Sequence, residues 1–212
     1  MTKLIALGYL ATLTTLDCQA LEQQSEELIL RVESGAVTGT ILALAKTEAA
    51  RILGHAGVHV HWKSVQDPRK VHRQMRECST PAPDVSDIDI LIVDASSRDD
   101  HPGALGYALP FAKTGFRVVI FWDRILAATE RPNAKLLGHV IAHETGHMLM
   151  GTLSHAGSGV MKAHWSGFDT STMQSHSFSF VPGDVEMIAR RFEQQRVSCQ
   201  EAGTLVSLLS PR

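Results

Sequence analysis

Residues 143–155, with the sequence HETGHMLMGTLSH, hold three histidines and one glutamate among small and apolar residues. His143 and His147 are four residues apart, a spacing that places two imidazoles on one face of a helix, about 6 Å apart along its axis. Both can then bind one metal ion through nitrogens about 2.0–2.1 Å from it. Glu144 lies further round the helix, from where its carboxylate can reach water bound to that ion. This HExxH pattern indicates a zinc site with a glutamate as general base.

A third ligand is expected just beyond this helix. Gly151 can end the helix in a left-handed conformation at low cost, so that the chain turns back towards the metal. His155 then supplies a third imidazole, and one coordination position stays open for water, as in catalytic rather than structural zinc sites. Met161 follows within GSGVM and is expected to form an apolar floor under the metal.

Two alternatives to this hypothesis stay open. In the first, an acid of the last predicted helix, Asp184 or Glu186, supplies the third ligand in place of His155. In the second, the chain is a secreted zinc-binding module without catalysis. Glu144 favours an enzyme, because a purely structural site has no use for a base beside an open coordination position.

Histidine is frequent in the chain, with 11 among 212 residues, so the others need their own interpretation. His139 lies one helical turn before His143 and is interpreted as a packing or hydrogen-bonding residue rather than a ligand. His59 and His61 point the same way from a predicted strand. That arrangement is more typical of a solvated strand face than of a second metal site.

The elements that position these residues follow from hydrophobic periodicity, glycines and prolines. Strands are predicted at 26–34, 58–65, 87–96, 104–111 and 117–123, and helices at 36–57, 132–151 and 181–197. The apolar run 87–96 is typical of a central strand, and Pro110 favours an edge position for 104–111. The predicted fold class is α+β, with a mixed twisted sheet, an active-site helix and a smaller C-terminal lobe closed by a helix.

Composition limits the class of partner. The chain is 44% hydrophobic and 20% charged, with a net charge of −2, as expected for a globular protein. It has no basic run, and its aromatic content of 6% is low for stacking on bases, so no nucleic-acid partner is expected. We expect a monomer.

The N-terminus is typical of a secretory signal. Lys3 precedes the apolar run LIALGYLATLTTL, and small residues follow near Ala20, where a signal peptidase could cut. We therefore predict a signal peptide at 1–20, a secreted or periplasmic location, and no membrane association after cleavage. Residues 21–212 form a single catalytic domain, with an upper lobe at about 21–151, a lower lobe at about 152–200 and a short tail.

Cleavage at this position removes Cys18 and leaves Cys78 and Cys199. In an oxidising compartment these two can form a disulfide that ties the C-terminal segment to the body of the domain. Two free buried thiols are the alternative, and the sequence does not distinguish them.

From about Ile88 to Phe192 the chain resembles the metzincin zinc peptidases, and among them the matrixins. PGALGYALP is similar to the family's edge strand, LGHVIAHETGHMLMG to its active-site helix, SGVM to its Met-turn and FSFVPGDVEMIARRF to its closing helix. The resemblance implies a metzincin-like zincin fold. It also implies a secreted zinc-dependent endopeptidase that hydrolyses peptide bonds with a zinc-bound water.

Carried over residue by residue, the resemblance implies one catalytic Zn²⁺ bound by His143, His147 and His155, with Glu144 as general base and Met161 as the Met-turn residue. It implies that a peptide lies antiparallel to the edge strand. The substrate-binding residues are then Gly103, Ala104, Leu105, Gly106, Tyr107 and Ala108, with His164 and Trp165 lining the substrate pocket.

The chain departs from the family at two places. His155 follows His147 by eight residues, where the family places its third histidine six residues after the second ligand. Tyr107 and Phe121 stand where matrixins have histidines for a structural zinc, so a second zinc is not expected.

Overall fold

The structure is a computed structural model that describes residues 25–35, 37–64, 85–97, 101–112, 117–129 and 133–209. The predicted signal peptide, Cys18, Cys78 and Pro132 lie outside these residues. The predictions that concern them stay predictions.

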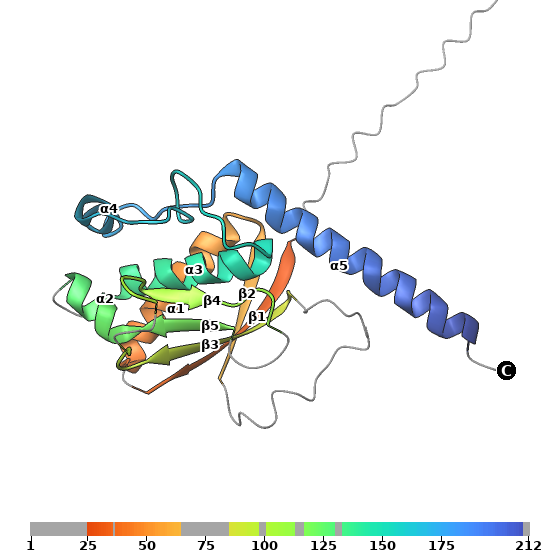
Figure 1. Cartoon of the computed structure of the whole chain (residues 1–212), viewed down its shortest axis with the longest axis horizontal. Coiled ribbons are helices and arrows are strands. Elements are labelled where there is room, and N and C mark those ends of the chain that lie inside the picture. The colour runs from red at the N-terminus through yellow and green to blue at the C-terminus, as the bar shows by residue number, and fades with distance from the viewer. Residues whose placement is uncertain are drawn as a thin grey trace, which may run out of the picture.

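Five strands form one mixed sheet in the order β2-β1-β3-β5-β4 (Figure 1). Neighbouring strands are parallel except β4, which runs antiparallel to β5. The strands are β1 (Glu26–Ser34), β2 (Val58–Ser64), β3 (Asp87–Val93), β4 (Gly106–Ala108) and β5 (Val118–Phe121). The predicted central position of 87–96 and edge position of 104–111 are therefore confirmed.

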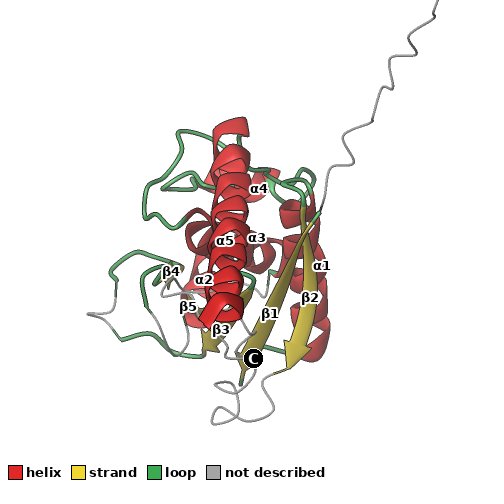
Figure 2. Cartoon of the chain, turned by 90° about the vertical axis from the view of Figure 1, so that its right-hand side faces the viewer, coloured by secondary structure: helices red, strands yellow, loops and turns green. Residues whose placement is uncertain are grey.

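Within the described ranges, five helices accompany the sheet: α1 (Gly39–Gly54), α2 (Trp122–Thr129), α3 (Ala134–Met150), α4 (Gly167–Thr172) and α5 (Pro182–Leu209). Helices α1 and α3 lie on the same side of the sheet and pack against each other, while α5 contacts α3 and runs past the strands (Figures 1 and 2). None of the described helices is long and apolar enough to cross a membrane.

The core lies between the sheet and these two helices. Inward-facing residues of the strands are fully or almost fully buried, among them Leu28, Leu30, Ile88, Ile90, Val118 and Ile120. From α1, Ala45, Ala49 and Ile52 face this core at helical spacing. The expectation of a mixed sheet packed with helices is confirmed.

Gly138 allows α3 to approach α1 closely. A Cβ added to this glycine would lie 2.6 Å from the Cβ of Glu48 and 2.8 Å from the carbonyl oxygen of Ala45. Any larger residue would push the two helices apart, so Gly138 sets the distance between α1 and the helix that carries the histidines.

The sequence-based prediction was wrong in three places. The run 117–123 was predicted as one strand, but β5 ends at Phe121 and α2 begins at Trp122. Helix α4 was not predicted, although Ser166 and Asp169 form the reciprocal capping hydrogen bonds that begin it. The last helix continues to residue 209, well beyond the predicted end at 197.

Candidate metal centre

Helix α3 is fixed at both ends. The side chain of Asn133 accepts a hydrogen bond from the backbone N–H of Leu136 (2.9 Å) and caps the N-terminus. At the other end, Gly151 adopts φ 65° and ψ 35°, and its N–H donates to the carbonyl oxygen of His147 (3.0 Å). The left-handed helix end predicted for Gly151 is confirmed, and it directs the chain back under the helix.

The loop after α3 orients the rings of His143 and His147. The Nδ1 of His143 donates to the carbonyl oxygen of Val160 (2.8 Å), and the Nδ1 of His147 donates to that of Thr152 (2.9 Å). A carbonyl can only accept, so both rings carry their proton on Nδ1. Each Nε2 therefore presents a lone pair, and the two Nε2 atoms lie 3.2 Å apart.

This arrangement fits a tetrahedral metal ion. Two nitrogens bound to Zn²⁺ at about 2.0–2.1 Å lie about 3.3 Å apart in tetrahedral geometry. His155 completes the group, because one ligand atom from each of the three histidines lies within 4.8 Å of the others. The ring centroid of His155 is 5.3 Å from that of His143 and 4.8 Å from that of His147. Three imidazoles of this kind leave one tetrahedral position open.

The surroundings keep these imidazoles neutral. Burial lowers the pKa of His143 to about 4 and that of His147 to about 4. The pKa of His155 is also lowered. Burial is the larger cause, and electrostatic repulsion from the nearby His164 adds to it. A metal binds the neutral ring, so these histidines need not lose a proton at neutral pH to become ligands.

Glu144 lies against the edge strand. A Cβ added to Gly106 would be 3.3 Å from the Oε1 atom of Glu144 and 2.8 Å from the carbonyl oxygen of Val119. Glu144 is 6% exposed as a residue, and burial raises the pKa of its carboxyl group to about 8. A carboxyl group with a pKa near neutrality can both accept and return a proton, which suits a general acid–base.

Met161 lies beneath α3 as an apolar floor. It is fully buried, and a Cβ added to Gly146 would lie 2.7 Å from its Sδ and 2.8 Å from the Cε1 of Phe180. Gly159 makes the turn that precedes it, with φ 74°. Its Cα lies so close to Ser179 that an added Cβ would be 2.5 Å from the carbonyl oxygen.

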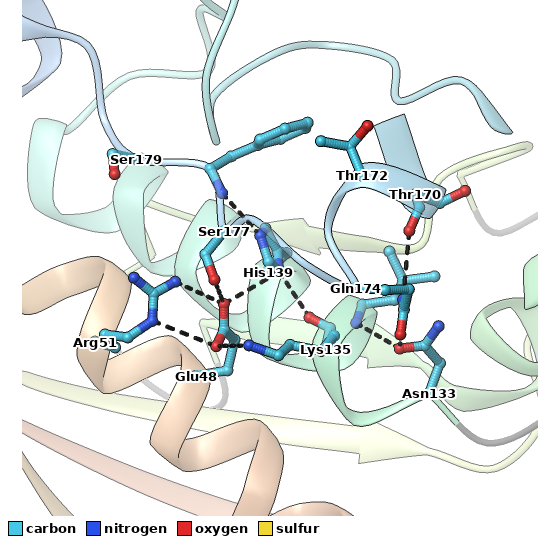
Figure 3. Close-up of polar contacts among 12 residues, drawn as sticks. Glu48, Arg51, Asn133, Lys135, His139, Thr170, Thr172, Gln174, Ser177 and Ser179 are labelled. Atoms are coloured by element: carbon cyan, nitrogen blue, oxygen red, sulfur yellow. Dashed lines mark hydrogen bonds and ion pairs between the residues drawn. The ribbon is translucent and has the colours of Figure 1, made fainter. Parts of the chain in front are cut away.

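His139 is a structural residue, as predicted, and among the described residues it belongs to no metal-binding group. Figure 3 shows its polar contacts with Lys135 and Glu48. Its Nδ1 donates to the carbonyl oxygen of Lys135 (2.7 Å), and its Nε2 accepts from the backbone N–H of Phe178 (3.1 Å). The buried carboxylate of Glu48 lies 3.8 Å from Nδ1 and binds the ammonium group of Lys135 (2.7 Å) and the hydroxyl group of Ser177. These contacts tie α1 and α3 to the segment beneath the histidines.

The predicted substrate-binding residues lie on two sides of the cluster. Gly106, Tyr107 and Ala108 form β4, and Gly103 to Leu105 lead into it. Tyr107 stacks on His101, with ring centroids 4.1 Å apart. On the other side, the ring of Trp165 packs edge-on against His143 at 5.4 Å, and His164 is near enough to influence the pKa of His155.

The alternative ligands lie apart from the three histidines. Asp184 is buried in the first turn of α5, where its side chain accepts from the N–H of Val181 (3.3 Å). Glu186 is exposed and pairs with Arg190. The histidine cluster contains neither acid among the described residues.

The strand histidines form no metal cluster within the described ranges. His59 is exposed, and the exposed His61 contacts Glu27 on the neighbouring strand. This agrees with their interpretation as a solvated strand face.

Two residues that shape the site escaped the sequence analysis. Gly146 carried a signal, because a glycine inside a helix is unfavourable and usually has a packing reason. Glu48 carried none, since its role depends on contacts with residues distant in the sequence. Gly106 was predicted as a substrate-binding residue, but its close approach to Glu144 was not.

Cys199 is disulfide-bonded, and the pairing with Cys78 stays a prediction.

No protein-family model and no curated protein sequence matches the chain. Among solved structures, the chain is similar to the archaemetzincin of Methanopyrus kandleri, with a TM-score of 0.47 and 16% identity over 82% of this chain and 99% of that one. It is also similar to two structures of myroilysin at 12% identity. One has a TM-score of 0.33, over 59% of this chain and 48% of that one, and the other has 0.36, over 75% and 65%.

Proposed function

We propose that the chain is a zinc-dependent endopeptidase with His143, His147 and His155 as ligands and Glu144 as general base. The observation that carries the proposal is the pair of Nε2 atoms 3.2 Å apart, with both Nδ1 atoms bound to backbone carbonyls. The third imidazole and the buried carboxyl group beside them supply the rest of a catalytic donor set. The proposed mechanism needs one bound Zn²⁺ ion.

Zn²⁺ at this site supplies a Lewis acid that polarises a carbonyl and lowers the pKa of water towards neutrality. Glu144 removes a proton from the attacking water and then delivers it to the leaving amine. Its burial supports this role, because a raised pKa matches the carboxyl group to proton transfer near neutral pH. Met161 holds the underside of α3 and excludes water there.

The substrate lies extended along the outer edge of β4. This strand has β5 on one side and no other described strand on the other, so a peptide can add to the sheet by main-chain hydrogen bonds. Gly106 suits close approach, since it has no side chain between the peptide and Glu144. His164 and Trp165 border the opposite side of the substrate.

The motifs support placement of the chain among metzincin-like peptidases, with a matrixin-like active-site helix. The proposal includes a signal peptide at 1–20, a secreted or periplasmic enzyme, one catalytic domain over 21–212 and a monomer. The non-catalytic binding module is the competing function, and activity separates the two.

The decisive experiment combines metal analysis of the purified protein with cleavage of a mixed peptide library, with and without a chelator. We expect about one zinc per chain, cleavage that the chelator abolishes, and recovery when zinc is restored. Glu144→Gln should bind zinc normally and lose turnover. A zinc-loaded wild-type protein that cleaves no peptide would support the binding module instead.

Zinc content also separates the two candidates for the third ligand. His155→Ala should lose zinc, whereas Glu186→Ala and Asp184→Asn should retain it. Loss of zinc in either acid variant, with zinc retained in His155→Ala, would overturn the assignment of the third ligand.

A further inference from the structure

A cavity of about 250 Å³ lies beyond the histidine cluster, where α5 passes the C-terminal end of α3 and the segment after β4. Three separate parts of the chain form its walls. The residues that matter for its chemistry are Phe111, Met150, Gly151, Met187, Arg190 and Arg191.

Arg191 gives the cavity an anion-binding group. Its Nε atom is buried and has no hydrogen-bond partner among the residues that the structure describes. Gly151 faces the guanidinium group without a side chain, and a Cβ there would lie 3.7 Å from Nε and 3.8 Å from Cζ. A buried donor without an acceptor is unfavourable. The guanidinium group that carries this donor also lines the cavity, where a carboxylate can bind it.

A second positive charge lies beside it. Arg190 pairs with Glu186 at 3.6 Å, but both side chains are about 70% exposed, and such a surface pair contributes little. Among the described residues, none of those that line the cavity is acidic. Its charge therefore favours an anion, and the paired N–H groups of an arginine match the two oxygens of a carboxylate.

The remaining wall is apolar. The side chain of Phe111 is 71% exposed and that of Met187 is 37% exposed, so both can cover a short aliphatic chain. A ligand that satisfies the whole cavity has an aliphatic stem and a carboxylate end. Among peptide side chains, glutamate fits this description, and aspartate fits it less fully.

The cavity lies within reach of a peptide at the metal centre. Met150 is three residues beyond His147, or about 4.5 Å along the helix axis. Phe111 is five residues beyond Gly106, which contacts Glu144, so at most about 17 Å of extended chain separates the two. A peptide that follows β4 can therefore place a side chain in the cavity within about five residues of the bond at the metal centre.

We propose that this cavity is a specificity subsite for an acidic side chain of the substrate, with Arg191 as the residue that binds its carboxylate. This inference rests on the proposed peptidase function. Arg191 does not act on the scissile bond. It increases the affinity for peptides that carry glutamate at one fixed position.

The test uses peptides that carry glutamate, or the isosteric glutamine, at each of five positions on either side of the cleaved bond. For the wild-type protein we expect kcat/KM to favour glutamate about tenfold at one position, as for a partly exposed charge-assisted hydrogen bond. Arg191→Gln should remove this preference, so that the ratio of kcat/KM for the glutamate and glutamine peptides falls to about one. Arg191→Lys should retain part of it, because the charge remains.

Peptide binding to the zinc-loaded Glu144→Gln protein provides a second readout that does not depend on turnover. If the wild-type protein cleaves nothing, but Glu144→Gln still binds glutamate peptides more tightly and Arg191→Gln in the same background does not, the peptidase proposal fails and the subsite stands. Equal binding of both peptides overturns the subsite. An equal loss for both peptides in Arg191→Gln, with a lower Tm, would also overturn it and assign Arg191 to the end of α3.

Discussion

The ring of His139 accepts a hydrogen bond from the backbone N–H of Phe178, and this contact connects α3 to the segment that supports the metal centre. At the next residue of that segment, the carbonyl oxygen of Ser179 accepts from the N–H of Val160 (2.9 Å). The carbonyl oxygen of Val160 in turn accepts from Nδ1 of His143. A residue one turn away from the cluster is thus linked to a candidate ligand.

We expect His139→Leu to lower the free energy of unfolding by about 1–3 kcal/mol, because it leaves the N–H of Phe178 without an acceptor. His139→Gln retains an acceptor and should cost less. Urea denaturation of both variants, with zinc affinity measured alongside, checks this. Equal stability of the leucine and glutamine variants would show that the hydrogen bond contributes nothing.

Gly146 leaves room for the floor of the site. We expect Gly146→Ala to destabilise the protein by about 1–3 kcal/mol, because the new methyl group would overlap with Met161 and Phe180. The matched control is Gly183→Ala in the first turn of α5, where an added Cβ meets nothing within 4 Å. That variant should be neutral or slightly more stable. Thermal unfolding of the two variants gives the comparison, and similar Tm values for both would contradict the packing argument.

The stability of the metal-free protein should depend on pH through His143 and His147. The pKa of each is about 4 in the folded protein, whereas an unfolded histidine has a pKa of about 6.5. The unfolded chain therefore binds protons first as the pH falls, and the free energy of unfolding decreases from about pH 6.5 to about pH 4. We expect a loss on the order of a few kcal/mol in chelator-treated protein.

Glu144 acts in the opposite direction. Its pKa of about 8 in the folded protein exceeds the unfolded value of 4.5. Its contribution to stability is therefore fully present below about pH 4.5 and is lost progressively as the pH rises to about 8. In Glu144→Gln, this decrease at high pH should disappear while the decrease at low pH remains. Urea denaturation of the metal-free wild-type and Glu144→Gln proteins between pH 4.5 and 8.5 measures both changes in the free energy of unfolding. Superimposable profiles would rule out the buried carboxyl group as the cause.

Zinc should stabilise the folded protein, because the unfolded chain lacks the site. At a free zinc concentration one hundred times the Kd, the stabilisation is about 2.7 kcal/mol. We expect a clear rise in Tm for the wild-type protein, and a much smaller rise for His143→Ala. The exposed His59 provides the control, since His59→Ala should respond to zinc like the wild type. A full response in His143→Ala would place the ion elsewhere.

Local patterns sufficed to predict much of the fold and the centre of the site. The spacing of His143 and His147 and the glycine at the helix end are short-range signals, and both have the predicted consequence in the structure. The boundary between β5 and α2 was missed because one apolar run continues through Phe121 and Trp122. Helix α5 exceeded its predicted length because its later turns lack a clear apolar period.

Contacts between distant segments could not be predicted. Glu48 is the single acid on the buried face of α1. Besides Arg51 on the same helix, its partners come from α3 and from the segment before α5. Gly106 meets Glu144 only because the sheet places β4 beside α3. Helical periodicity and capping rules describe neighbours along the chain and carry no information on these pairs.

The loop between Gly151 and Met161 contributes Thr152, His155 and Val160, and so it both donates one ring and fixes the tautomers of the other two. We therefore expect docking of this loop and capture of the cation to be coupled, so that a substitution that displaces Thr152, His155 or Val160 weakens both together.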